Sequence, residues 1–280
     1  MRVIRSTAAM QRLAGRLRCA GRVGFVPTMG FLHEGHLSLV RVARKKSDAV
    51  VVSVFVNPIQ FGPGEDLDAY PRNVVRDRRL LRQEGVDVVF CPDAKAMYPD
   101  GFATSVQVER LTRGLCGQTR PGHFEGVTTV VAKLLNIVKP NVAVFGQKDV
   151  QQALVVRRMV RDLDYDTRIV IAPTMREPDG LALSSRNCYL TPEQRSQAPV
   201  LYRSLLLGRR LVRDGGRDAT KVKRAMRRMI RKESEFRIDY VEIVDCEELQ
   251  PVPRIKGRTL VAVAAYLGRA RLIDNIILRA

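Results

Sequence analysis

The chain has 280 residues, of which 45% are hydrophobic and 28% charged, a balance typical of a soluble globular protein with one large or two ordinary domains. No apolar run approaches the roughly 18 residues of a membrane-spanning helix, so the composition excludes an integral membrane protein. The net charge of +19 at pH 7 also fits a nucleic-acid-binding protein, so charge alone does not decide the class.

Alternating strands and helices are predicted for the first two-thirds of the chain. The run at 48–56 is nearly all β-branched, as in strands buried on both faces of a parallel sheet. In chain order the predicted elements are a helix at 7–19, a strand at 23–26, a helix at 35–46, the strand at 48–56, a helix at 71–84, a strand at 86–90, a helix at 124–138, a strand at 142–145, a helix at 149–163 and a strand at 167–172. Residues 105–108 are compatible with a further short strand. This order predicts an α/β fold with a doubly wound parallel sheet, as an N-terminal domain over residues 1–176.

The pattern changes near residue 176. Glu177-Pro-Asp-Gly180 predicts a turn and hinge. Helices are expected at 192–212 and 219–233, and strands at 237–244 and 260–265. We therefore expect a smaller α+β C-terminal domain over residues 177–280. Clefts between domains are common ligand sites.

Much of the positive charge lies in this second part, where twelve Lys and Arg and only two acidic residues fall between Arg203 and Lys232. The segment also places four apolar residues on one helix face, Val222, Met226, Met229 and Ile230. No aromatic residues interleave with the cations, as stacking on single strands would require. We interpret the charge as a solvated helix face that attracts small anions, and we expect no nucleic-acid partner.

The five cysteines lie singly along the chain, with no CxxC pair. This pattern indicates neither a disulfide framework nor a zinc ribbon. Because the sequence also has no secretory signal, we expect a cytoplasmic location, where thiols stay reduced.

The stretch at 22–36 is the most informative part of the chain. It predicts a short strand, a turn with Pro27 and Gly30, and a helix start that carries His33 and His36 on one face. Three interpretations remain open: two ordinary helix histidines, half of a metal site, or a phosphate site at a helix N-terminus. No cysteine or third histidine lies nearby to complete a zinc set, which weakens the metal interpretation.

The residues Pro27-Thr-Met-Gly-Phe-Leu-His-Glu-Gly-His36 resemble the His-x-Gly-His motif of the nucleotidylyltransferase superfamily, in the form found in the pantoate–β-alanine ligase family. Further blocks match the same family in order, and they lie at 55–61, 68–72, 120–124, 145–152, 179–187 and 270–275. The resemblance thus covers essentially the whole chain. Single members of these blocks, such as Lys148, Gln152 or Ser184-Ser-Arg186, are weak signals alone, and their joint order carries the inference.

The resemblance implies a Rossmann-like nucleotide- and pantoate-binding domain followed by a C-terminal lid domain. It also implies an ATP-dependent condensation of (R)-pantoate with β-alanine to pantothenate in the cytoplasm. In this reaction ATP first adenylates pantoate and releases pyrophosphate, and β-alanine then displaces AMP from the pantoyl adenylate. ATP as a substrate, Mg²⁺ and a homodimer belong to the same expectation.

Site residues are implied by the same resemblance. The expected catalytic residues are His33, His36, Lys148 and Arg186. The expected ATP-binding residues are Met29, Gly30, Phe31, Leu32, His33, Glu34, Gly35, His36, Gly146, Gln147, Lys148, Asp149, Met175, Leu183, Ser184, Ser185 and Arg186. Gln60 and Gln152 are expected to bind pantoate, Gln60 also β-alanine, and Asp77 is a candidate ligand for Mg²⁺ with pyrophosphate. His123 is equally compatible with a structural hydrogen bond and is not included.

Three positions depart from the family pattern. Gln147 stands where the family usually has Glu, Arg76 where it has an acidic residue, and Val150 where it has an aromatic residue. These changes bear on nucleotide affinity and metal use, yet they leave the histidines unchanged, so we expect activity. Two alternatives stay open: an adenylyl transferase of the same superfamily with another acceptor, and a basic nucleic-acid-binding protein.

Overall fold

The computed structural model describes residues 1–279, and the chain divides into two compact units. The first unit comprises residues 1–109, 120–147 and 152–173. The second comprises residues 110–119, 148–151 and the chain from 174 onward. Within residues 1–279, no helix has the length and apolar run needed to cross a bilayer.

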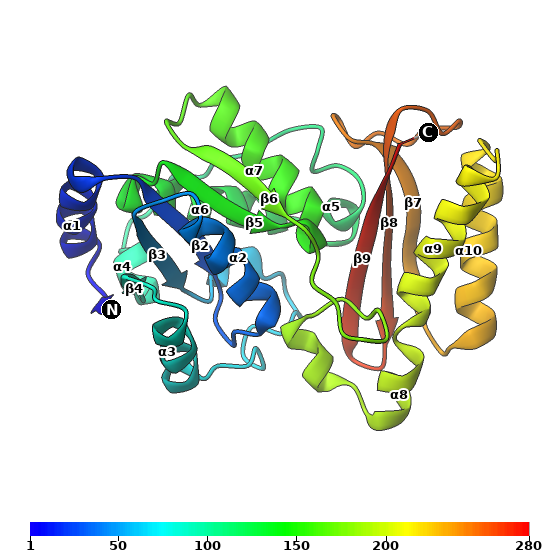
Figure 1. Cartoon of the computed structure of the whole chain (residues 1–280), viewed down its shortest axis with the longest axis horizontal. Helices are drawn as coiled ribbons and strands as arrows, with labels where there is room; N and C mark the ends of the chain where they lie inside the picture. The colour runs from blue at the N-terminus through cyan, green and yellow to red at the C-terminus, as the bar shows by residue number, and fades with distance from the viewer. Residues whose placement is uncertain (280) are drawn as a thin grey trace. The chain divides into compact units, whose positions relative to one another are not determined.

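A six-stranded sheet forms the centre of the first unit (Figure 1). Its strands are β1 (Arg2–Ile4), β2 (Val23–Thr28), β3 (Ala49–Val54), β4 (Val88–Phe90), β5 (Val142–Gly146) and β6 (Arg168–Ala172). They run in the order β1-β4-β3-β2-β5-β6, and all neighbouring pairs are parallel. β2 and β3 pair in register from Val23 with Ala49 to Thr28 with Val54, so both strands end at the same edge. This confirms the predicted doubly wound sheet, whose carboxyl edge is where such folds bind ligands.

Helices cover both faces of this sheet. They are α1 (Thr7–Ala20), α2 (Glu34–Arg44), α3 (Val74–Gln83), α4 (Ala94–Met97), α6 (His123–Val138) and α7 (Val150–Asp162). The buried apolar residues of α2 and α3 pack with those of β2, β3 and β5 in one core cluster. α1 packs against α6 on the opposite face, as right-handed crossovers in a sheet of this order require.

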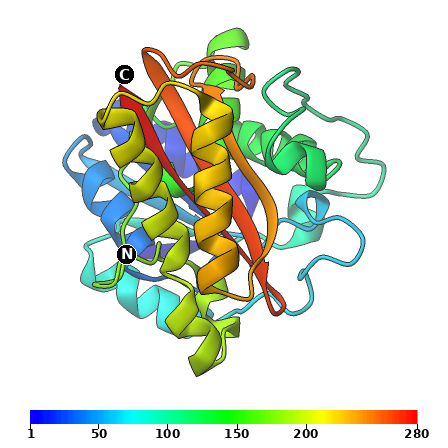
Figure 2. The ribbon, with the colours of Figure 1, turned by 90° about the vertical axis from the view of Figure 1, so that its right-hand side faces the viewer.

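Three antiparallel strands form the sheet of the second unit, in the order β7 (Arg237–Asp245), β8 (Arg258–Leu267) and β9 (Ala270–Arg279). α9 (Val200–Arg213) and α10 (Ala219–Glu233) lie side by side across one face of it (Figures 1 and 2). Gly208 allows this close approach, because a Cβ there would lie 3.0 Å from the sulfur of Met226. The short helices α5 (Cys116–Thr119) and α8 (Pro192–Gln197) complete the unit.

The prediction of a single helix at 192–212 was wrong, because this segment forms two helices, α8 and α9, with Ala198 and Pro199 between them. Proline lacks the N–H that a continuous helix would need there. Residues 105–108 form no strand, since the backbone of Val106 bonds instead to the hydroxyls of Thr128 and Thr129 on α6. The short strand β1 and the long strand β9 were not predicted.

Candidate active site

The turn after β2 brings the histidine motif to the carboxyl edge of the sheet. Gly30 has φ +87°, and a Cβ there would lie 3.0 Å from a methyl group of Val54, so the turn requires glycine. Phe31 also adopts a left-handed conformation, with φ +50°. These two residues reverse the chain so that His33 becomes the N-cap of α2.

Both histidines use their Nδ1 atoms to cap this helix. Nδ1 of His33 accepts the N–H of Gly35 at 3.1 Å, and Nδ1 of His36 accepts the N–H of His33 at 3.3 Å. The ring centroids are 4.1 Å apart. An accepting Nδ1 assigns the proton of each neutral ring to Nε2. The arrangement therefore gives two imidazole N–H donors at a helix N-terminus, where the helix dipole also favours anions.

Asp77 and Arg76 on α3 hold the backbone of this turn. The two carboxylate oxygens of Asp77 accept the N–H groups of Phe31 and Leu32, each at 2.8 Å. Arg76 donates to the carbonyl of Leu32 at 2.7 Å, and its guanidinium lies 5.6 Å from the ring centroid of Phe31. Burial raises the pKa of Asp77, while the N–H groups of Leu32 and Phe31 oppose that rise.

The predicted magnesium role of Asp77 does not fit this geometry. Its side chain is 1% exposed, and both oxygens already accept backbone hydrogen bonds. Among residues 1–279, no group of three or more His, Cys, Asp and Glu side chains could hold a metal ion.

The loop after β3 places Gln60 beside Met29. Nε2 of Gln60 lies 3.0 Å from the sulfur of Met29, and its Oε1 accepts from Asn57 at 3.1 Å. Asn57 in turn donates to the carbonyl of Gly126 at 3.0 Å and accepts from the hydroxyl of Tyr98 at 2.6 Å. Burial raises the pKa of Tyr98, which keeps this hydroxyl a donor. The Gln60 side chain is therefore held by Met29 and Asn57, and Asn57 is itself fixed by Gly126 and Tyr98.

His123, which the sequence left undecided, supports the same loop. Its Nδ1 lies 2.8 Å from the carbonyl oxygen of Gln60, and its Nε2 lies 2.9 Å from Arg120. Arg120 also forms an ion pair with Glu65 at 2.5 Å. The structural hydrogen bond that the sequence allowed for His123 is thus present, but its partner Gln60, 63 positions away, gave no local signal.

In the second unit, Lys148 and Ser184 lie on one small pocket. Asp274 lines the same pocket, together with apolar residues of β9, α9 and the 181–182 segment. Nζ of Lys148 is 3.5 Å from a carboxylate oxygen of Asp149. The side-chain amide of Asn275 donates to the carbonyl of Lys148 at 2.9 Å, which fixes the backbone of this lysine.

Asp274 is almost fully buried and pairs with Arg176 through two hydrogen bonds of 2.6 and 2.9 Å. Burial raises the pKa of Asp274, an effect that Arg176 opposes. Arg176 also donates to the carbonyl of Gly180 at 3.0 Å. The segment that precedes the Ser-Ser-Arg block is therefore anchored to β9.

The expected ATP-binding residues Ser184, Ser185 and Arg186 lie at the start of a short 3₁₀ helix, Ser185–Tyr189. Oγ of Ser184 accepts the N–H of Arg186 at 3.2 Å. Leu183 donates its N–H to the carbonyl of Met175 at 3.0 Å, so these two predicted ATP residues lie side by side. Arg186 is half-buried.

The two adjacent glutamines of α7 have different surroundings. Gln151 is buried in the second unit, where it donates to the carbonyls of Leu111 and Gly114 and accepts from the N–H of Cys116. Gln152, the predicted pantoate ligand, is half-buried and belongs to the first unit.

Comparison with known proteins gives the family. Residues 2–277 match the model of the family described as Pantoate-beta-alanine ligase. The chain belongs to this ligase family. Its predicted membership and α/β fold are thereby confirmed, and its activity is the ATP-dependent ligation of pantoate with β-alanine.

Two members of the ligase family illustrate how far the similarity extends. The pantothenate synthetase of Thermotoga neapolitana is 56% identical over 279 residues, which is 99% of this chain and 100% of that protein. That of Moorella thermoacetica is also 56% identical over 279 residues, covering 99% of each.

Solved structures of the ligase family agree with the fold. Pantothenate synthetase from Thermus thermophilus superimposes with a TM-score of 0.94 at 53% identity, covering 99% of both chains. The enzyme from Francisella tularensis, solved in complex with β-γ ATP and β-alanine, gives a TM-score of 0.80 at 34% identity and covers 99% of this chain and 97% of its own.

Proposed function

We propose that this ligation proceeds through a pantoyl adenylate and that the two histidines after β2 bind the phosphates of ATP. In the first step a carboxylate oxygen of pantoate attacks the α-phosphorus, and pyrophosphate leaves. In the second step the amine of β-alanine attacks the acyl carbon, the amine loses its proton, and AMP leaves. The ATP and β-alanine bound to the Francisella tularensis enzyme support the same substrates here.

The observation that carries this proposal is the Nε2–H of each imidazole at the start of α2. Negative charge grows on the phosphate oxygens as the α-phosphorus is attacked, and N–H donors that are already oriented stabilise it without reorganisation. His33 and His36 are oriented in this way, because their Nδ1 atoms accept backbone N–H groups. In our proposal Nε2–H of His36 donates a hydrogen bond to the phosphate oxygens as pyrophosphate leaves and keeps its proton, because the ring is neutral.

Lys148, Ser184, Ser185 and Arg186 are proposed as a second set of phosphate ligands. Lys148 supplies a compact positive charge, whereas Arg186 can hold two phosphate oxygens at once. The shared pocket of Lys148 and Ser184 supports a joint role. Gln147 beside Lys148 is neutral, so Asp149 is the acidic side chain that pairs with this lysine, at 3.5 Å.

Gln60 and Gln152 are proposed to bind pantoate, and Gln60 also β-alanine. An amide suits this task, because the pantoate carboxylate loses its charge when it is adenylated and a neutral donor serves both states. The fixed orientation of Gln60, set by Asn57, supports its role. Resemblance to the family supports two further expectations, a homodimer and a cytoplasmic location, which light scattering and cell fractionation test.

The test is pyrophosphate release from ATP with D-pantoate, with and without β-alanine, in the wild type, His36→Ala, Lys148→Ala and Lys45→Ala. We expect release to need pantoate, and AMP and pantothenate to appear only with β-alanine. Each of the first two substitutions should lower kcat at least about 100-fold, as loss of a transition-state contact does. Lys45→Ala removes an exposed cation at the other end of α2 and should leave kcat unchanged. ADP as product, or wild-type kcat in His36→Ala, would contradict the proposal.

A further inference from the structure

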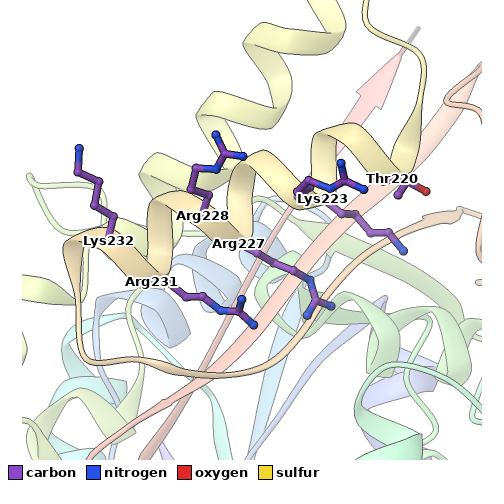
Figure 3. Close-up of a pocket in the computed structure, with 7 residues that line it drawn as sticks. Thr220, Lys223, Arg227, Arg228, Arg231 and Lys232 are labelled. Carbon is purple, nitrogen blue, oxygen red and sulfur yellow. The ribbon is translucent and has the colours of Figure 1, made fainter.

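The exposed side of α10 forms a continuous basic surface. We call it the α10 basic surface. It lines one shallow depression and consists of Thr220, Lys223, Arg224, Arg227, Arg228, Arg231 and Lys232. Figure 3 shows the labelled side chains spreading from the helix, Arg228 and Lys232 to one side and Arg227 and Arg231 to the other. None of the residues proposed for the ligase reaction belongs to it.

Most of these cations have no acidic partner. Lys223 and Arg227 share Glu242, at 2.9 and 3.6 Å. Within residues 1–279, the remaining four form no ion pair with an acidic side chain, and they are Arg224, Arg228, Arg231 and Lys232. Four exposed charges on one helix face therefore repel each other, and a bound polyanion would relieve that repulsion.

The chemistry of the α10 basic surface limits its partner. The apolar side of the helix packs into the core, with Val222 at 2% exposure, Met226 and Ile230 at 0% and Met229 half-buried, so little hydrophobic surface is left to enter a lipid bilayer. The depression is lined by no aromatic side chain on which an unpaired base could stack. The α10 basic surface therefore offers contacts to anionic groups such as phosphates.

The spacing of the unpaired cations fits a phosphate backbone. Arg224, Arg228 and Lys232 follow each other at four-residue steps, which are about 6 Å each along the helix axis. Each strand of a duplex carries one phosphate per roughly 3.4 Å of the axis, so a row of cations about 6 Å apart can follow the phosphates of one strand. We propose that the α10 basic surface binds the phosphate backbone of double-stranded nucleic acid without reading its sequence. The absence of aromatic residues, which led us to expect no nucleic-acid partner, argues only against single strands.

The test measures fluorescence anisotropy of labelled DNA and RNA duplexes of about 20 base pairs, roughly two turns, with the full chain between about 50 and 200 mM salt. We expect a Kd of about 10⁻⁶ to 10⁻⁴ M that depends little on sequence. A plot of the logarithm of Kd against the logarithm of the salt concentration should be linear. Its slope should have a magnitude of about 3 to 4, as four phosphate contacts imply. Absence of binding at the lowest salt would overturn the proposal.

Matched double variants test whether the duplex binds to the α10 basic surface or simply responds to the net charge of the protein. Arg224→Gln with Arg228→Gln should reduce the slope by about 2 and weaken binding about five-fold for each arginine near 0.15 M salt. Arg12→Gln with Arg16→Gln removes the same charge from exposed residues at the same spacing on α1 and should change neither. Equal losses in both variants would show that the overall charge binds, and the proposal would fail.

Further measurements check that the loss of duplex binding comes from the α10 basic surface and not from misfolding. Arg231→Gln with Lys232→Gln tests the other end of the surface in case the first variant folds poorly, and it should weaken binding to a similar extent. All variants should keep wild-type ligase activity, which shows that they fold. Vesicles containing anionic lipid are the competing partner, and binding to them without binding to duplexes would overturn the proposal.

Discussion

Replacing Asp77 by Asn tests whether α3 holds the histidine turn in place. The carboxylate accepts two backbone N–H groups at 2.8 Å while only 1% exposed. An amide offers one acceptor and turns its NH₂ toward the other N–H, so one charge-assisted hydrogen bond is lost and one N–H loses its partner. Each effect is worth about 1.5 to 3 kcal/mol, and relief from burying a charge offsets part of the sum. We expect unfolding free energy to fall by about 2 to 4 kcal/mol.

The same substitution should lower kcat as well as stability. Leu32 and Phe31 directly precede His33, and a misplacement of about 1 Å in a catalytic group can cost about 100-fold in rate. We therefore expect kcat of Asp77→Asn to fall at least about tenfold at a temperature where the variant is fully folded. Urea unfolding followed by circular dichroism gives the stability, and pyrophosphate release gives kcat.

Asp245→Asn is the matched control. Its carboxylate accepts the N–H groups of Glu247, Glu248 and Gln250 at 2.6 to 2.8 Å, in a loop of the second unit. This variant should also lose stability, because the same kind of bond is broken, but it should keep wild-type kcat. If Asp77→Asn loses stability and yet keeps kcat, the turn does not depend on Asp77, and our reasoning is refuted.

Three other substitutions have clear expected outcomes. Gly126→Ala places a Cβ 2.3 Å from the carbonyl oxygen of Ile59, so it should displace the loop that carries Gln60. If Gln60 binds pantoate as proposed, the KM for pantoate should rise more than that for ATP; unchanged steady-state kinetics would contradict this. Asn275→Ala removes the hydrogen bond to the carbonyl of Lys148, so the proposed phosphate ligand is held less firmly and kcat should fall about tenfold. Loss of a bond worth about 1.4 kcal/mol should also lower the melting temperature by a few degrees, and an unchanged kcat would contradict a positioning role. The hydrogen bond from Arg195 lowers the pKa of Asp179 in the folded protein. The ion pair between them therefore stabilises the fold above the ordinary Asp pKa near 3.9. This stabilisation is lost as the pH falls through the lower folded-state pKa. Asp179→Asn should accordingly be less stable than the wild type by a constant small margin, less than about 1 kcal/mol, from about pH 5 to 7. That margin should shrink below about pH 4, and a margin that does not change would exclude this ion pair.

Local sequence patterns predicted the regular elements well where local signals agree. Residues 219–233 were predicted as a helix and form α10, because Asp218 caps its start and the apolar residues repeat at helical spacing. The strand β9 was missed, since Asp274 and Asn275 interrupt its apolar pattern. Both are buried and bonded to Arg176 and Lys148, so local rules failed where a strand carries polar residues that hold the site.

For the candidate site, the sequence predicted the groups that we propose to face a ligand but not those that hold them. The spacing of His33 and His36 indicated a shared helix face, yet nothing local showed that Asp77 braces their turn from 44 positions beyond His33. The contacts of Tyr98 and His123 with the Gln60 loop likewise join residues tens of positions apart. Such partners are fixed only once the sheet order is known.

At position 33 the capping atom and the proposed ligand-binding atom are different nitrogens of one ring. Asn or Ser at this position would cap α2 equally well, since both accept the N–H of a first-turn residue, but neither would supply an Nε2–H. A descendant with His33 replaced in this way would therefore keep its fold while losing its chemistry. If Nε2 of His33 binds phosphate as proposed, a gene copy of this ligase becomes a stable, inactive paralogue through a single substitution at position 33.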